Sequence, residues 1–153
     1  MERIIELVTQ FRQAIDEARD DGRFYKDICF GGFPRACCGD ASDLLAHYLL
    51  VHGFQTYYVC GNYYGDEEGG HQSHAWLELH DGTIIDITGD QFKHKEVYLN
   101  YDIPVYIGGM DNFHALFEVE EQNIRTGVRL ERLGDWVYPR LKQLYDVISE
   151  YIR

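Results

Sequence analysis

Hydrophobic side chains recur at helical spacing in three segments of the chain. Residues 2–20 carry an apolar residue at about every third or fourth position, with Glu, Gln, Arg and Asp between them, which predicts an amphipathic helix. Residues 38–52 are apolar around more than half of the helical circumference, which predicts a largely buried helix that ends at Gly53. The same spacing returns in residues 135–152 and predicts a C-terminal helix.

After the second helix, the pattern changes to that of β-strands. Residues 55–63 are rich in Tyr, Thr and Val, and residues 73–80 alternate in part between apolar and polar side chains. Asp81 and Gly82 form a strong turn signal, and residues 83–87 supply the returning strand. We therefore expect an antiparallel meander in the middle of the chain.

The other segments give a weaker pattern. The acidic, glycine-rich residues 65–72 predict a connecting loop. Residues 101–107 predict a further strand, and residues 113–119 fit either a strand or a helix. Helices followed by strands and a final helix indicate a single α+β domain over residues 1–153.

Charge and composition narrow the range of partners. The 153 residues include 26 acidic and 14 basic side chains, for a formal net charge of −12. Such a surface repels phosphate backbones and anionic lipids, so nucleic acid and membranes are poor candidate partners. The N-terminus has neither the basic start nor the apolar run of a signal peptide, and no stretch approaches the ~20 apolar residues of a spanning helix. We expect a cytoplasmic protein whose four cysteines stay reduced.

One of these cysteines stands where a nucleophile would be activated. Cys38 begins the second predicted helix, directly after a loop that contains Gly31, Gly32 and Pro34. Backbone N–H groups at a helix N-terminus stabilise a thiolate and can also receive an oxyanion. Because Cys37 is adjacent, position alone does not choose between the two thiols.

Two further groups complete a catalytic set. His74 opens the strand 73–80, and Asp86 lies on the returning strand. If the two strands pair across the turn, the numbers of opposite residues sum to about 163. Residue 89 then faces His74, and Asp86 lies three positions away from it. We expect a bulge to bring His74 and Asp86 together. A thiol, an imidazole and a carboxylate are the groups that nucleophilic acyl transfer requires. We expect no cofactor and no metal in such a site.

The residues around these groups resemble the transglutaminase-like superfamily, whose members share the papain-like architecture. The run from Ala36 to Leu45 is similar to the family's nucleophile helix, in which an acidic residue stands two positions after the cysteine and a glycine fifteen after it. Asp40 and Gly53 take those places when counted from Cys38, and this register selects Cys38 over Cys37.

The resemblance extends to the two strands that follow. The run from His74 to Leu79 is similar to the histidine strand of the family, and the run from Ile85 to Thr88 is similar to its aspartate strand. The match covers residues 34–92, and it implies a nucleophile helix packed on an antiparallel sheet with additional N- and C-terminal helices. It departs from the family pattern at Ala36, where the family has glycine.

The resemblance implies a thiol enzyme with the triad Cys38, His74 and Asp86. Its substrate would be a peptide, protein or small amide, attacked to give a thioester that water or an amine then releases. Peptidase or deamidase activity is favoured over cross-linking, because a chain of this length has little from which to build a second groove that excludes water. The Cys38 backbone N–H is the expected oxyanion donor, with Gln72 and Tyr63 as further candidates, and Asp40 is expected to turn away from the thiol and cap the helix.

Two other functions remain open on the sequence. The fold could serve as a catalytically inactive binding module, with a tyrosine-rich surface around Tyr57, Tyr58, Tyr63 and Tyr64. A metal site is the third reading, in which His71 and His74 join cysteines and Asp86. Asp90 and Gln91 follow Asp86 closely and are read as a polar loop that could line the site.

Overall fold

The structure is a computed structural model that describes residues 1–65 and 71–153. Most of the acidic loop predicted over residues 65–72 therefore lies outside the described residues. The α-helices are α1 (Glu2–Asp20), α2 (Cys38–Val51) and α3 (Tyr138–Glu150). The strands are β1 (Tyr57–Tyr63), β2 (Gln72–Glu78), β3 (Ile84–Asp86), β4 (Tyr106–Gly108) and β5 (Glu118–Thr126). Short 3₁₀ helices are η1 (Phe30–Gly32), η2 (Gly89–Phe92), η3 (Glu96–Tyr98), η4 (His114–Leu116) and η5 (Leu130–Leu133).

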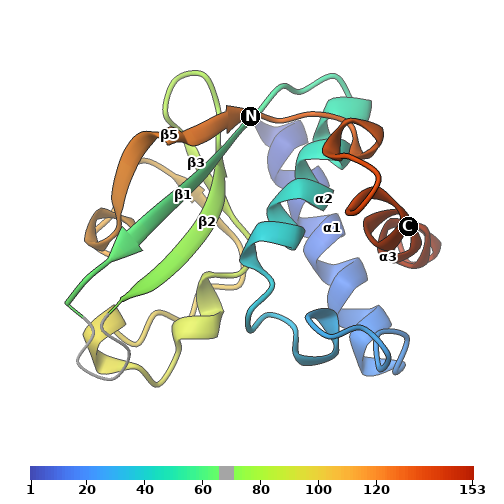
Figure 1. Ribbon diagram of the computed structural model, residues 1–153, viewed down its shortest axis with the longest axis horizontal. Coiled ribbons are helices and arrows are strands. Elements are labelled where there is room, and N and C mark those ends of the chain that lie inside the picture. Colours follow the sequence, from blue (N-terminus) through green and yellow to red (C-terminus); the bar gives the residue numbers. More distant parts are fainter. Residues whose placement is uncertain (66–70) are drawn as a thin grey trace.

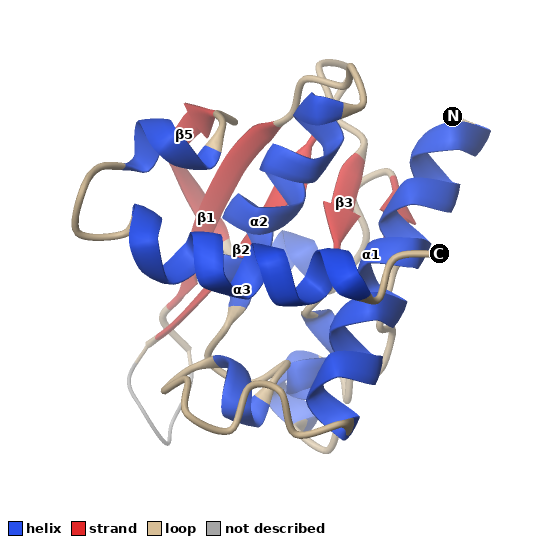
Figure 2. Ribbon diagram, turned by 90° about the vertical axis from the view of Figure 1, so that its right-hand side faces the viewer, coloured by secondary structure: helices blue, strands red, loops and turns tan. Residues whose placement is uncertain are grey.

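The three α-helices lie together on one side of the sheet (Figure 1). The sheet has the order β4-β3-β2-β1-β5, and all of its pairings within the described residues are antiparallel. Seen from the helical side, α3 crosses in front of the sheet and α1 stands at the edge near β3 (Figure 2). This arrangement confirms the α+β class and the central meander β1-β2-β3. No helix in the described ranges combines the length and the apolar character needed to cross a bilayer.

The strands beyond the meander differ from the prediction. The strand predicted over residues 101–107 begins only at Tyr106, because Pro104 has no N–H to offer a ladder and its carbonyl is taken by Arg12 Nη1 at 3.0 Å. The sequence of residues 113–119 fits either a strand or a helix, and in the structure this segment contains η4 and the start of β5. Most side chains of β5 are exposed, and for this reason its sequence lacks the apolar alternation of a half-buried strand.

Two apolar clusters lie on opposite faces of the sheet. The cluster on the helical side joins α1, α2 and α3 to Leu77, Ile85 and Ile87 and is mainly aliphatic. The second cluster contains Val59, Trp76, Ile84, Phe92, Tyr98, Tyr101, Phe113 and Phe117. Its rings come largely from residues 92–117, so this segment covers the face of the sheet that the helices leave open. Alternation in β2 explains the division, since Leu77 faces the helices and Trp76 faces the rings.

A buried arginine ties α1 to the segment that follows β3. Arg12 forms a bidentate pair with Asp90, at 2.9 Å from Nη1 to Oδ1 and 2.8 Å from Nη2 to Oδ2, and Nη1 also donates to the Ile87 carbonyl at 2.7 Å. Its Nε donates to Asp16 one helical turn away. Burial acts to lower the pKa of Arg12, but the bonds and charge of Asp90 raise it above its ordinary value. Asp90 therefore holds η2 in place, and Gln91 with it.

The register of β2 and β3 corrects the sequence prediction by one residue. The observed pairs are Leu77 with Ile85 and Glu78 with Ile84, so opposite residues sum to 162 rather than 163. Continuing this register sets Asp86 opposite Trp76. His74 is then two residues along the same face, which is the diagonal neighbour position of an antiparallel pair. The predicted bulge is therefore not needed to bring His74 and Asp86 together.

Candidate active site

The loop before α2 sets Cys38 at the first helical position. Ala36 takes the left-handed conformation with φ 59°, which costs an L-residue about 1–2 kcal/mol. The helix has no side-chain N-cap, and its first backbone hydrogen bond runs from the Ala41 N–H to the Cys37 carbonyl. The N–H groups of the first turn, starting with that of Cys38, are therefore free of intrahelical partners.

The thiol of Cys38 is half-buried and lies against β2. It faces the His74 imidazole and the Ala75 backbone N–H. β3 pairs with β2 only at Leu77 and Glu78, so Ala75 lies beyond the end of that ladder and its neighbourhood is open to α2. Burial acts to raise the pKa of Cys38, but the bond and positive charge of His74, with the Ala75 N–H, lower it below its ordinary value.

His74 links the thiol to Asp86. Its Nε2 lies 2.7 Å from Asp86 Oδ2, and both side chains are buried, so Nδ1 is the nitrogen that remains for Cys38. Burial acts to lower the pKa of His74, yet the charge of Asp86 and the bonds to Asp86 and Cys38 raise it to about 9. Burial likewise acts to raise the pKa of Asp86, but His74 and a second histidine hold it well below its usual range. The structure thus brings together the three residues predicted from the sequence.

That second histidine is His114, which the sequence analysis did not include. Its Nε2 lies 2.8 Å from the same Asp86 Oδ2, and its Nδ1 lies 2.7 Å from Asp111 Oδ1. Asp111 also receives the His114 backbone N–H at 2.7 Å, which fixes the turn into η4. An aspartate three residues before a histidine is a cap signal visible in the sequence, but nothing local indicates that η4 folds back onto β3.

Aromatic rings enclose the polar chain formed by His74, Asp86, His114 and Asp111. The His74 ring packs against Trp76, Phe92, Phe113 and Phe117, with centroid separations of 5.1–5.7 Å. Gly89 is also required here, because a Cβ at that position would lie 2.6 Å from the Tyr101 ring and 3.2 Å from Asp86 Oδ2. The low-dielectric surroundings strengthen the His74–Asp86 interaction.

The neighbouring thiol, Cys37, has different surroundings. It is buried, and its S–H donates to the carbonyls of Cys29 and Arg35 at 2.9 and 3.1 Å. Burial raises the pKa of Cys37 to about 12. Burial also raises the pKa of the Cys29 and Cys60 thiols. Cys38 is therefore the one cysteine of the four, all within the described ranges, whose surroundings favour the thiolate.

The first acidic residue of α2 turns away from the thiol, as expected, but it does not cap the helix. Asp40 Oδ2 pairs with Arg140 of α3 at 2.8 Å. Arg140 also holds Asp27, whose carboxylate accepts the N–H groups of Cys29 and Phe30. The cap prediction is wrong because a guanidinium within reach forms a stronger, charge-assisted bond. This pairing keeps a negative charge from facing Cys38 unneutralised.

The side chains suggested as oxyanion donors have other contacts. The Gln72 amide donates to the Ser73 carbonyl at 3.0 Å, and the Tyr63 ring packs on Tyr98 and Phe117. The side-chain amide beside the imidazole is instead that of Gln91, whose Nε2 lies 3.4 Å from His74 Nδ1 and 3.1 Å from the Thr88 carbonyl. Gln91 therefore lines the site and is not merely a polar loop residue, whereas Asp90 is committed to Arg12.

The structure does not assemble the metal site read from the sequence. His71 is exposed and stacks on Tyr64, at 5.4 Å between ring centroids. Over the described ranges, the one group with metal-ligand spacing is His74, Asp86 and His114, and no cysteine belongs to it. Its imidazole–carboxylate distances of 2.7 and 2.8 Å are those of hydrogen bonds, so the geometry fits a hydrogen-bonded chain.

The tyrosine-rich surface is only partly present. Tyr63 belongs to the aromatic cluster, and Tyr58 is half-buried under Arg125, whose guanidinium carbon lies 3.9 Å from the ring centroid. Tyr64 is exposed. Cys38 is only partly buried, and His74 lies beside its thiol.

The chain matches no protein-family model, no curated protein and no solved structure in three comparisons. The geometry of the site therefore carries the functional proposal.

Proposed function

We propose that this protein is a cysteine-dependent amide-bond hydrolase or acyl transferase that works through a thioester, with Cys38 as nucleophile, His74 as acid and base, and Asp86 as the group that orients His74. The observation that carries the proposal is the continuous contact Cys38–His74–Asp86 at the N-terminus of a helix. The chain order and the helix-on-sheet arrangement agree with a papain-like, transglutaminase-like fold, which we propose as the finer class.

The reaction begins from a thiolate–imidazolium pair. The Cys38 sulfur attacks the carbonyl carbon of an amide, and the carbonyl oxygen takes up the negative charge. The free N–H groups of the first turn of α2 and the Gln91 amide are the donors available to that oxygen. The C–N bond then breaks, the His74 proton goes to the departing amine, and an acyl thioester remains on Cys38.

The second half of the reaction restores the enzyme. Water or an amine attacks the thioester carbonyl, His74 accepts its proton, and the C–S bond breaks to return the thiolate. Asp86 stays ionised throughout and holds the imidazole with Nε2 inward, so that Nδ1 faces the sulfur. Hydrolysis is favoured over cross-linking, because a chain of 153 residues has little from which to build a second groove that excludes water.

A trapping experiment tests the proposal. At neutral pH, p-nitrophenyl acetate should acylate Cys38 and release nitrophenol, and intact-protein and peptide mass spectrometry should locate the acetyl group there. Cys38→Ala should lose at least about 10³-fold of the acylation rate, whereas Cys37→Ala should stay within a few-fold of the wild type. Added hydroxylamine and water compete for the thioester, and their ratio separates acyl transfer from hydrolysis. Acylation of Cys29 or Cys60 as fast as that of Cys38 would overturn the proposal.

A further inference from the structure

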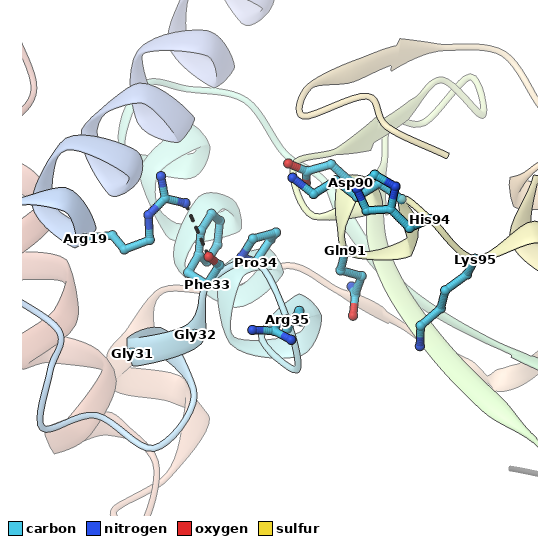
Figure 3. Close-up of a pocket in the computed structure, with 11 residues that line it drawn as sticks. Arg19, Gly31, Gly32, Phe33, Pro34, Arg35, Asp90, Gln91, His94 and Lys95 are labelled. Atoms are coloured by element: carbon cyan, nitrogen blue, oxygen red, sulfur yellow. Dashed lines mark hydrogen bonds between the residues drawn. The ribbon is translucent and has the colours of Figure 1, made fainter. Parts of the chain in front are cut away.

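A basic cleft lies beside the candidate active site of this acidic protein. It has a volume of about 700 Å³, within the range of ligand-binding clefts. One wall is the loop before α2, with Gly31, Gly32 and the residues up to Arg35, and the other is η2 with the turn that follows it (Figure 3). The two walls thus come from the segments that position the nucleophile and the imidazole.

The cleft concentrates positive charge. Its lining includes Arg19, Arg35, Lys93 and Lys95 against a single carboxylate, that of Asp90. Elsewhere acidic side chains are in excess, since the whole chain has 26 acidic and 14 basic residues. A cleft lined by one sign of charge focuses the field and raises the local concentration of oppositely charged ligands.

Among the residues that the structure describes, the pairing of these charges leaves three cations available. Both oxygens of Asp90 are taken by Arg12, at 2.9 and 2.8 Å. Arg19 is neutralised by Asp16 and Asp20, each at 3.1 Å, and also donates to the Phe33 carbonyl. In contrast, Arg35, Lys93 and Lys95 are exposed and form no ion pair within residues 1–65 and 71–153.

The cleft shares Gln91 with the candidate active site. Gln91 lines it, and the amide of this residue lies 3.4 Å from His74 Nδ1, the atom that faces Cys38. Arg35 stands three residues before Cys38 on the opposite wall. The clamp of Arg12 on Asp90 fixes η2, so the cationic wall is held at a constant position relative to the imidazole.

We infer that this cleft binds the anionic flank of an amide substrate, so that the substrate class is a peptide with carboxylate or phosphate groups within a few residues of the amide attacked by Cys38. This inference rests on the proposed function, because it places the amide at Cys38. Arg35, Lys93 and Lys95 contact the anionic groups, and they discriminate against peptides that carry lysine at the same positions.

Binding is measured without turnover, in Cys38→Ala protein. Four fluorescein-labelled peptides share a central glutamine and differ in the residues on either side of it, which are Glu, phosphoserine, Gln or Lys. Fluorescence anisotropy gives the Kd of each peptide. The Glu or phosphoserine peptide should bind about tenfold more tightly than the Gln peptide, and the Lys peptide should bind most weakly. The Glu and phosphoserine arms show which anion is preferred. The advantage should shrink in 0.5 M NaCl, since exposed pairs are screened.

A charge-matched pair of variants locates the effect. Lys93→Glu with Lys95→Glu, added to Cys38→Ala, should abolish the preference for the anionic peptides. The double variant Arg129→Glu with Arg132→Glu changes the net charge by the same amount at an exposed site on another face. It should keep the preference for the anionic peptides. Equal Kd values for the four peptides, no binding of any of them, or equal losses in both double variants would overturn the inference.

These outcomes are separable from those of the trapping experiment. Acetylation of Cys38 without any preference among the peptides would leave the proposed function in place and remove the anionic cleft. Preference for anionic peptides in a protein whose Cys38 is not acylated would keep a binding site and remove the enzyme.

Discussion

Cys37 and Cys38 are adjacent in the chain, yet their thiols lie in chemically opposite surroundings. Cys37 faces two backbone carbonyls, which accept its S–H and offer nothing to a thiolate. Cys38 faces the Ala75 N–H and the His74 imidazole, both of which lower the pKa of the thiol. Both thiols are at least half-buried, so burial alone does not separate them. Donors rather than exposure decide which of the two is reactive.

The contrast continues into the wider structure. The carbonyls around Cys37 come from the loop formed by η1 and the turn before α2, which packs into the aliphatic cluster. The donors around Cys38 come from β2, which is held against β3 and the aromatic cluster. The start of α2 therefore lies between two different surroundings. Those of Cys37 favour its protonated thiol, and those of Cys38 favour the thiolate.

The largest expected difference between the two thiols is in their rate of alkylation. Cys38 should react with iodoacetamide at pH 7 about 100-fold or more faster than Cys37, whose pKa of about 12 leaves almost no thiolate. The Cys38 rate should reach a plateau at a lower pH than the rate of an ordinary thiol, and the plateau should extend to about pH 9, where His74 loses its proton. The Cys37 rate should instead rise about tenfold per pH unit, as expected for a thiol far below its pKa.

Quantitative peptide mass spectrometry after timed alkylation measures both rates in one sample. His74→Gln is the matched variant, because it keeps the burial of Cys38 and removes the charge. Its Cys38 pKa should rise above the ordinary thiol value, since burial then acts without the imidazolium. Parallel pH profiles for Cys37 and Cys38 in the wild type would contradict the distinction between them.

A smaller effect on the reactivity of Cys38 is expected when the Asp86 carboxylate, which contacts the His74 imidazole, loses its charge. In Asp86→Asn, His74 loses the carboxylate that raises its pKa, so the pKa of His74 should fall below about 9 and the imidazolium should be lost at a lower pH. The alkylation plateau should therefore end at a lower pH, and acylation by p-nitrophenyl acetate should fall about 10²-fold. The reactivity of Cys38 should then be closer to that of Cys37, although neither cysteine has been substituted.

Asp111→Asn is the control for that change. It alters a carboxylate that contacts His114 and Tyr101 but not His74, so the plateau should keep its width. If Asp111→Asn narrows the plateau as much as Asp86→Asn does, the polar chain acts as one unit through His114, and Asp86 is not the specific partner of His74.

The sequence was sufficient for the parts of this site that local patterns determine. The helix start indicates Cys37 or Cys38, the alternating strand indicates His74 and the tight turn indicates Asp86, whereas the choice of Cys38 over Cys37 depends on the resemblance to the transglutaminase-like nucleophile helix. The register of the two strands was one residue off, because the turn signal at Asp81 and Gly82 does not fix how the ladder begins.

The remaining partners depend on how distant segments return to the sheet. His114 reaches Asp86 because η4 folds across the open face, and the aromatic residues that drive this packing show no period along the chain. Gln91 reaches His74 because Arg12, on α1, clamps Asp90. Both arrangements arise from long-range contacts of buried side chains, which residue spacing does not encode.

The smallest expected effect concerns the residue that joins the loop around Cys37 to the helix of Cys38. Ala36 has φ 59°, and glycine would adopt this conformation without the Cβ penalty of about 1–2 kcal/mol, while losing more backbone entropy on folding. Ala36→Gly should therefore stabilise the protein by about 0.5–1 kcal/mol, measured by urea denaturation. The alkylation rates of Cys37 and Cys38 should not change, because the donors and acceptors around both sulfurs come from other residues. A changed Cys38 rate would instead show that the strained turn itself positions the thiol, and that the difference between the neighbouring cysteines depends on backbone geometry as well as on hydrogen-bond donors.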